Sequence, residues 1–260
     1  MIALSVNLNK IALLRNARGQ DARPALLDFA RLAMQAGAAG LTVHPRPDQR
    51  HIRVADVPAL AAWLRTHYPT AEFNIEGNPL AAPRADGYPG LEALVEESRP
   101  AQVTLVPDGD GQLTSDHGWA MTDEDIATLS PLVARFKKLG ARVSVFMDPN
   151  PEAISRVPET GADRIELYTE PFAEAFNADG RRLGPATKES LALFRAAGES
   201  AQALGLGVNA GHDLDLDNLV ALRTLPNLLE VSIGHALIAD ALELGFYGAV
   251  ARYRATLEAA

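Results

Sequence analysis

Short apolar runs alternate with longer amphipathic segments along the whole chain. Eight of the runs are predicted to be β-strands, because each is short, mostly apolar and bounded by turn-forming residues. Runs of this kind are typical of strands that are buried in a parallel sheet. The predicted strands span residues 2–8, 40–44, 72–76, 102–106, 142–148, 163–169, 207–210 and 229–234.

Between the strands, apolar residues recur at the spacing of an α-helix. The segment 123–139, for example, places Leu129 and Val133 on one face, which indicates a helix that packs on a core. The other predicted helices span residues 24–36, 56–68, 91–98, 150–159, 187–204, 215–225 and 236–257. Gly245 and Gly248 are candidate breaks in the last of them.

The alternation of strand and helix predicts an α/β fold with parallel strands joined by right-handed crossovers. Eight such units in 260 residues favour one closed (β/α)₈ TIM barrel, a single domain over residues 1–260, over an open doubly wound sheet. The segments 78–89 and 107–119 are long for barrel loops. Because long loops are often functional, we expect the second to act as a lid.

Composition and charge narrow the classes of partner. The chain has 47% hydrophobic residues. Its formal net charge of −9 argues against nucleic acid or an anionic membrane as the partner. It has no cysteine, which excludes disulfides and Cys-ligated metals and fits a reducing cytoplasm. Residues 1–10 are interpreted as the first strand and not a signal peptide, and no run of about 18 apolar residues predicts a membrane span. We therefore expect a cytoplasmic protein.

One segment, residues 42–52 with the sequence TVHPRPDQRHI, gathers histidine and arginine at a strand end. It holds His44, Arg46, Arg50 and His51. Arginine binds phosphate groups through paired hydrogen bonds, and histidine transfers protons near neutral pH. The combination is typical of enzymes that act on phosphorylated substrates, although a solvated charged loop is the alternative.

Other predicted strands also end in polar residues. In a barrel, the carboxyl ends of all strands meet at one mouth, where active sites lie, so we expect these side chains to converge. Glycine-containing loops and a helix that begins near the last strand also favour phosphate binding by backbone N–H groups. Each residue alone has a plain structural explanation; their convergence is what favours function. The candidates beyond the first cluster are Asn7, Asn9, Lys10, Glu76, Glu166, His212, Asp213, Gly234 and His235.

Three other functions fit parts of this pattern. A Schiff-base aldolase needs a lysine inside the barrel, and only Lys10 of the four lysines lies near a strand end. A metal-dependent hydrolase could use the histidines, but no HxH or HExxH spacing is present and we predict no metal site. A non-catalytic binder of small molecules is the third alternative.

Seven motifs together resemble the pyridoxine 5′-phosphate synthase family. In chain order they are VNLNKIALLRNARG, TVHPRPDQRHI, FNIE, LVPDGDGQLTSDHG, RIELYT, VNAGHDL and SIGHALI, and they extend from Val6 to about Ile238. The resemblance implies a (β/α)₈ barrel with additional helices, assembled as a homo-octamer. Its substrates would be two phosphorylated small molecules, 1-deoxy-D-xylulose 5-phosphate and 3-amino-2-oxopropyl phosphate. The implied products are pyridoxine 5′-phosphate, inorganic phosphate and water, formed without a metal or an organic cofactor.

The resemblance also implies roles for individual residues. His44 and Glu76 would accept protons, His212 would donate one, and Glu166 would supply a charge that stabilises the transition state. The loop 107–119 would close over the site. The implied substrate-binding residues are Asn7, Arg18, Arg46, His51, Thr114, Asp213, Gly234 and His235.

The chain departs from the family's pattern at two positions near its start. The family commonly has an Asp-His pair, which helps to hold deoxyxylulose phosphate, where this chain has Asn9 and Lys10. Asn9 keeps hydrogen-bonding groups, and Lys10 keeps a donor and gains a permanent positive charge. We therefore expect both to contact that substrate. Asp213 stands where glycine is frequent, so we expect its backbone to do the binding.

Overall fold

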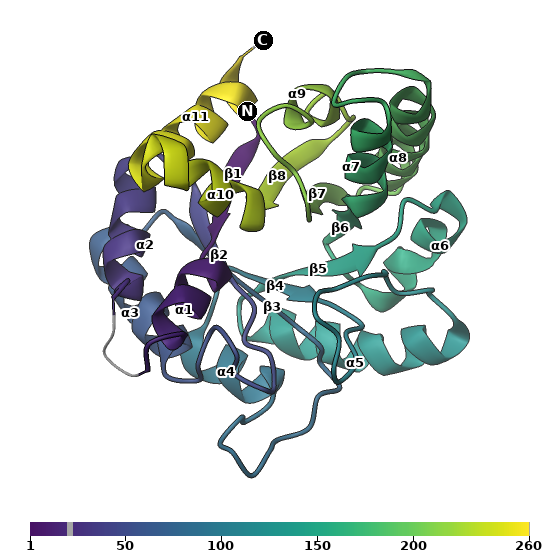
Figure 1. Ribbon diagram of the computed structural model, residues 1–260. Helices are drawn as coiled ribbons and strands as arrows, with labels where there is room; N and C mark the ends of the chain where they lie inside the picture. The colour runs from purple at the N-terminus through teal and green to yellow at the C-terminus, as the bar shows by residue number, and fades with distance from the viewer. Residues whose placement is uncertain (20–22, 260) are drawn as a thin grey trace.

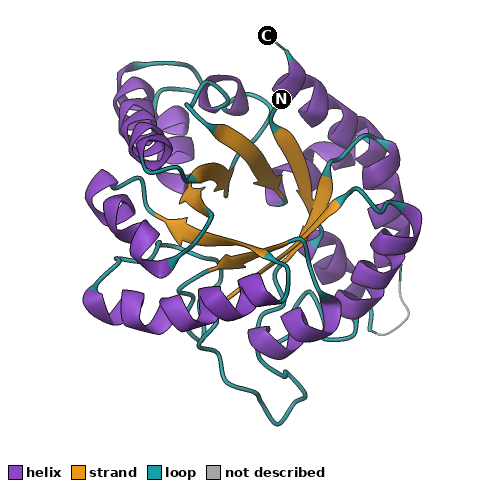
Figure 2. Cartoon of the chain, turned by 180° about the vertical axis from the view of Figure 1, so that it is seen from behind, coloured by secondary structure: helices purple, strands orange, loops and turns teal. Residues whose placement is uncertain are grey.

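The computed structural model describes residues 1–19 and 23–259 and shows a closed barrel of parallel strands in the order β1 to β8. Helices surround the ring of strands on all sides (Figure 1; Figure 2 shows it from behind). This confirms the predicted (β/α)₈ barrel, and each strand ends within one residue of its prediction. The strands are β1 (Ala3–Asn7), β2 (Gly40–Val43), β3 (Glu72–Gly77), β4 (Gln102–Leu105), β5 (Arg142–Met147), β6 (Arg164–Tyr168), β7 (Gly207–Gly211) and β8 (Leu228–Ile233).

The described residues form more helices than the one per strand of a simple barrel, as the family resemblance implied. Two were not predicted from the sequence, α1 and α7, because both are short and begin directly after a strand. The predicted last helix is divided at Gly245, whose φ of 69° does not continue a helix, whereas Gly248 lies within α11. The helices are α1 (Asn9–Asn16), α2 (Leu26–Gln35), α3 (Asp56–His67), α4 (Leu91–Ser98), α5 (Asp123–Lys138), α6 (Pro151–Arg156), the 3₁₀-helix η1 (Val157–Thr160), α7 (Glu170–Ala178), α8 (Pro185–Ala203), α9 (Leu219–Leu222), α10 (His235–Leu244) and α11 (Phe246–Glu258). None of these helices is long and apolar enough to cross a membrane.

Side chains alternate along the strands between apolar and polar. The apolar ones, such as Val6, Leu41 and Ile165, are fully buried and belong to one core cluster with the helices. Most of the intervening side chains are polar, and those of Ser5, Thr42, Asn74 and Thr104 hydrogen-bond to one another across the strands, which places them inside the barrel. Since successive side chains of a strand point to opposite faces, the alternation gives each strand one apolar and one polar face.

A chain of hydrogen bonds crosses the barrel interior at mid-height. Ser5 and Thr42 lie 2.7 Å apart through their hydroxyls, and the Asn74 amide donates to Thr42 at 3.4 Å. The Thr104 hydroxyl then lies 3.2 Å from the Asn74 oxygen and also 3.2 Å from a Glu166 carboxyl oxygen. Side chains from β1, β2, β3, β4 and β6 are thereby held in fixed positions below the barrel mouth.

The amino end of the barrel holds a cluster of opposite charges around one buried carboxylate. Glu230 is 4% exposed and accepts a hydrogen bond from Arg164 at 3.2 Å. Arg142 pairs with Glu72 through both carboxyl oxygens and donates to Gln102 at 2.8 Å. Because an unpaired buried charge costs several kcal/mol, these reciprocal contacts are what allow the charges to lie here.

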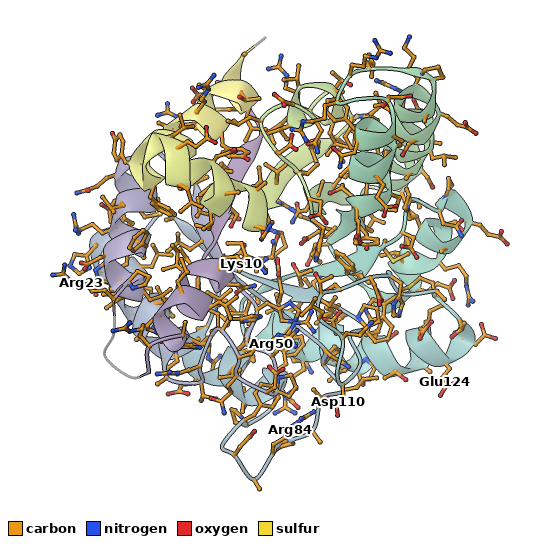
Figure 3. The ribbon with its side chains drawn as sticks, in the orientation of Figure 1. Lys10, Arg23, Arg50, Arg84, Asp110 and Glu124 are labelled. Carbon is orange, nitrogen blue, oxygen red and sulfur yellow. The ribbon has the colours of Figure 1, made fainter. Side chains whose placement is uncertain are left out.

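The predicted lid, residues 107–119, begins at the end of β4 and returns to the barrel at Trp119. The Trp119 backbone donates to Phe146 at 2.9 Å, and its indole donates to Leu105 at 2.9 Å. Gly118 lies against the end of β5, where a Cβ would come within 2.5 Å of the Met147 backbone. Figure 3 shows this loop and the loop 78–89 projecting together, with Arg84 and Asp110 paired between them. Closure of this loop over the site stays a prediction.

We expect Gly118→Ala to lower the free energy of unfolding by about 1–3 kcal/mol, the usual range for overpacking a tight site. The added methyl group meets backbone atoms, which cannot rotate away. Urea unfolding measures the change. Gly109→Ala in the same loop is the matched control, because the nearest atom to its Cβ would be 3.6 Å away on a side chain. Equal stability of Gly118→Ala and wild type would show that the loop is not packed this way.

Candidate functional site

The carboxyl ends of the strands surround a cavity of about 390 Å³. Its walls come from β1, β2, β3, β6, β7 and β8, together with the lid and the N-termini of α1 and α10. Lys10 is seen near the centre of the view in Figure 3, with Arg50 beside the same mouth. Of the predicted site residues, those that line the cavity are Asn7, Asn9, Lys10, His44, Arg46, His51, Glu76, Thr114, Glu166, His212, Asp213, Gly234 and His235.

One predicted residue lies elsewhere. Arg18 is exposed in the turn after α1, outside the lining of this cavity. It immediately precedes Gly19 and the part of the chain beyond the described residues. The charged residue of that region that reaches the interior is Arg15, which is 9% exposed.

His44 is fixed from both sides at the end of β2. Its backbone N–H donates to the Asn9 side chain at 2.9 Å, so Asn9 ties the end of β1 to the end of β2. On the ring, Nδ1 lies 3.7 Å from Glu76 Oε2 and Nε2 lies 3.4 Å from Asp108 Oδ2. Burial lowers the pKa of His44 well below 6.5, and the nearby Arg46 cation lowers it further. The imidazole is therefore neutral at pH 7.

Arg46 forms an ion pair with the lid. Its guanidinium lies 2.6 Å from Asp108 Oδ2, and both side chains are almost fully buried. The Ser115 hydroxyl donates to the same oxygen at 3.0 Å, and Arg46 also lies 3.5 Å from the Gln112 carbonyl. Arg50 donates to the carbonyls of Gln112 and Leu113 at 2.7 and 2.8 Å. The arginines after β2 thus hold the lid in the position that is seen.

The loop that carries His51 is supported by α1. Arg15 and Asn16 both donate to the His51 carbonyl, at 3.2 and 2.7 Å, and Arg15 forms a two-point ion pair with Asp56. The His51 ring accepts the Ile52 N–H at Nδ1. Burial, and then the arginines nearby, lower the pKa of His51 to about 3, so it is neutral at pH 7. Its other nitrogen, Nε2, can then bear the proton and act as a donor.

Two glutamates enter the cavity floor. Burial raises the pKa of Glu166 to about 8, and the Glu230 carboxylate below adds to this. Burial also raises the pKa of Glu76 well above 4.5, with further contributions from Glu166 and Asp108. The Thr104 hydroxyl has one proton but lies near two oxygens, those of Asn74 and Glu166. If it donates to Asn74, a protonated Glu166 can donate to it, and both hydrogen bonds are then made. Gly211 leaves room for it, because a Cβ there would come within 2.6 Å of Glu166 Oε1.

His212 lies opposite, in a left-handed backbone conformation with a φ of 83°. Its ring packs against Phe146 and Tyr168, with centroids 5.1 and 5.5 Å apart. Thr169 donates to the carbonyls of Gly211 and His212 and so holds this turn. Burial lowers the pKa of His212 to about 4. Within the described residues, its Nδ1 atom is buried without a hydrogen-bond partner.

The loops after β7 and β8 meet the N-terminus of α10. This helix begins at His235, with Gly234 at its N-cap position. A Cβ on Gly234 would come within 3.2 Å of Asn7, so glycine permits close approach here. The free N–H groups of the first helical turn and the positive end of the helix favour an anion.

Sequence reasoning missed Asp108 and Ser115. Both are on the lid, and only the path of the loop brings them to β2. Their one signal in the sequence is the position of Asp108 just after a strand end.

Among the residues that the structure describes, no group of three or more His, Asp or Glu side chains has the geometry to hold a metal ion.

Solved structures share this fold at low sequence identity. The tryptophan synthase α₂β₂ complex from Pyrococcus furiosus includes a chain with a TM-score of 0.60 and 14% identity, and the match covers 99% of this chain and 96% of that one. The thiamine phosphate pyrophosphorylase of the same organism gives a TM-score of 0.58 at 12% identity, covering 99% and 95%. At these identities the likeness supports the barrel alone.

Sequence comparison identifies much nearer relatives. A protein of Xanthomonas oryzae pv. oryzae named pyridoxine 5′-phosphate synthase is 55% identical over 253 residues, which cover 97% of this chain and 95% of that protein. One of the same name from Allorhizobium ampelinum is 51% identical over 256 residues, covering 96% of each. The family model described as pyridoxal phosphate biosynthesis protein PdxJ matches residues 4–259. The chain therefore belongs to the PdxJ family of pyridoxal phosphate biosynthesis proteins.

Proposed function

We propose that this chain is a pyridoxine 5′-phosphate synthase. It condenses 3-amino-2-oxopropyl phosphate with 1-deoxy-D-xylulose 5-phosphate to give pyridoxine 5′-phosphate, inorganic phosphate and water. The observation that supports this most strongly is the meeting of His44, Glu76, His212 and Glu166 around one cavity, in a chain that is 55% identical to a protein of that name.

The protonation states suit a condensation that moves several protons. Joining an amine to a ketone, closing the ring and losing water each need a positioned acid or base. The imidazoles of His44 and His212 are neutral and can accept protons, whereas burial raises the pKa of Glu76 and favours its protonated form. Glu76 becomes a proton acceptor after it has given its proton away, and His212 becomes a donor after it has received one.

Glu166 is best placed to respond to positive charge. Below about pH 8 it is mainly neutral, and it ionises when a cation, such as an iminium carbon–nitrogen bond, forms nearby. A carboxylate that develops together with the cation stabilises it more than the resting state. This is the role we assign to it in the transition state.

Two groups of residues can hold the two phosphates. Arg46 and His51 flank one side of the cavity, together with Thr114 of the lid, and we assign them to deoxyxylulose phosphate along with Asn9 and Lys10. The turn at Asp213 and the start of α10 form the other side. We assign Asn7, Asp213, Gly234 and His235 to the amino-oxopropyl phosphate. A substrate-binding role for Arg18, which lies outside the lining of the cavity, stays a prediction.

The Schiff-base aldolase alternative has less support. Lys137 and Lys138 lie on α5, Lys188 lies on α8, and Lys10 lies on α1. None of the four lysines is therefore on a barrel strand, where such an enzyme holds its nucleophile. We assign no cofactor and no metal to the reaction.

We further propose that the chain acts as one domain in the cytoplasm and assembles as a homo-octamer. An apolar groove of about 640 Å³ lies between α1, α2, α10 and α11. Leu242 on its rim is 84% exposed, and Tyr247 is 52% exposed. An exposed apolar groove of this kind is a candidate for burial against another subunit.

Incubation of the protein with both phosphorylated substrates should give pyridoxine 5′-phosphate, detected by its absorbance and mass. His44→Ala and His212→Ala should each lower kcat by about 10²–10⁴-fold, the usual contribution of a general acid or base. His67→Ala is the matched control, because this histidine is exposed on α3 outside the cavity. Failure of wild type to form product would refute the proposed function, and near-normal turnover in either variant would remove that residue from the mechanism.

The pKa of Glu166 predicts a pH dependence of stability. The folded state binds this proton up to about pH 8, whereas the unfolded chain binds it only up to about pH 4.5. The contribution of Glu166 to the free energy of unfolding therefore declines as the pH rises between these values. Glu166→Gln removes the dependence. The free energy of unfolding of this variant, measured with urea and taken relative to that of wild type, should therefore increase from pH 5 to about pH 8. Parallel stability curves for the two proteins would contradict the raised pKa.

The assembly proposal predicts that Leu242→Arg lowers the molar mass measured by light scattering. A charge placed in a buried apolar contact is not solvated, so association weakens. Leu193→Arg on α8 is the control, because that leucine is 56% exposed and lies outside the groove. An octameric mass for the Leu242 variant would show that the contact lies elsewhere.

A further inference from the structure

We propose that Asp108 is a positioning residue that holds His44 in the tautomer with its proton on Nε2. The basic lone pair is then on Nδ1, which faces Glu76. This inference rests on the proposed function for its kinetic consequences, but its structural claim can be tested without them.

The geometry around one carboxyl oxygen supports the assignment. Asp108 Oδ2 lies 2.6 Å from Arg46, 3.0 Å from the Ser115 hydroxyl and 3.4 Å from His44 Nε2. The side chain of Asp108 is only 6% exposed. The distance to His44 is long for a hydrogen bond, as catalytic contacts often are before the substrate binds.

The ionised form of Asp108 is favoured by its neighbours. Burial raises the pKa of this carboxyl, and the Arg46 guanidinium and the Ser115 hydroxyl act in the opposite direction. A permanent cation at 2.6 Å supplies the charge that a buried carboxylate needs. Asp108 therefore has an acceptor to offer to the imidazole N–H.

The other side of the ring has a different partner. Glu76 faces Nδ1 at 3.7 Å, and burial raises the pKa of its carboxyl, which favours the protonated form that can donate. A neutral imidazole has one donor and one acceptor nitrogen. With the proton on Nε2, each nitrogen faces a group of the matching kind, Nδ1 the Glu76 carboxyl at 3.7 Å and Nε2 the Asp108 carboxylate at 3.4 Å. The opposite tautomer would place the bare Nε2 lone pair against the Asp108 carboxylate.

Asp108 acts from behind His44 and does not face the main cavity. It lines a second cavity of about 340 Å³ beneath the loop 78–89, and it does not line the main cavity. His44 and Arg46 line both cavities. The three side chains thus form the wall between the two cavities, which is the place for a residue that orients a catalytic group without contacting the substrate in the main cavity.

Asp108→Asn should lower kcat by at least about tenfold, while KM for the amino-oxopropyl phosphate, which is assigned to the side of the cavity away from Arg46, changes by less than about threefold. An amide can present its N–H to His44 and then favours the wrong tautomer, as in catalytic triads that lose their aspartate. Asp108→Glu, which keeps the charge, should recover part of the loss. Asp110→Asn is the matched control, because this carboxylate of the same loop is 79% exposed and pairs with Arg84, not with His44.

Magic-angle-spinning ¹⁵N NMR of histidine-labelled protein tests the tautomer directly, since ring nitrogens with and without a proton resonate far apart. The chain has six histidines, and His44→Gln identifies the signal of His44. Wild type should show the proton on Nε2, and Asp108→Asn should shift it toward Nδ1.

Three results would overturn the proposal: a wild-type proton on Nδ1, an unchanged tautomer in Asp108→Asn, or a kcat for that variant within about twofold of wild type. Because the wild-type spectrum needs no variant, a variant that fails to fold does not leave the question open. Absence of product from the wild-type protein would refute the proposed reaction and leave the spectroscopic result standing by itself.

Discussion

The structure depends on the burial of polar side chains inside a barrel that is closed to water by its apolar outer face. Each buried polar group without a partner costs about 1–3 kcal/mol, so the interior is stable only when its groups pair with one another. The hydrogen-bond chain from Ser5 to Glu166 and the arginine–glutamate cluster at the amino end provide these partners. The same pairing fixes the side chains on which the cavity rests.

Electrostatics follow from this arrangement. Glu230, Glu166 and Glu76 are all buried inside the barrel, and burial raises the pKa of each. The carboxylate of Glu72 adds to this for Glu230, that of Glu230 for Glu166, and that of Glu166 for Glu76. The arginines at the amino end partly neutralise Glu230, but they are far from the mouth. Burial therefore favours the protonated forms of Glu166 and Glu76, while burial first, and the cations of the β2 loop second, lower the pKa of the adjacent His44 imidazole. Acids and bases coexist at one pH because burial acts on them in opposite directions.

Much of this was predictable from the sequence, for physical reasons. The strands were found to within one residue because their outward faces are apolar and their ends are marked by turn residues. Convergence of thirteen predicted side chains followed from the barrel itself, since all strand ends meet at one mouth. The helix α1 was missed because Asn9 and Lys10 are polar and were interpreted as the end of a strand. Asp108 was missed because a long loop has no periodicity that could indicate where its side chains lie.

The anchoring of Trp119 has a practical consequence. The chain has two tryptophans, and the other, Trp63, stacks on His67 at the outer surface of α3. Trp119 is 7% exposed at the point where the loop rejoins the barrel. Its intrinsic fluorescence therefore reports on the base of the loop without an added label, and the emission of Trp63 provides an internal reference far from the mouth.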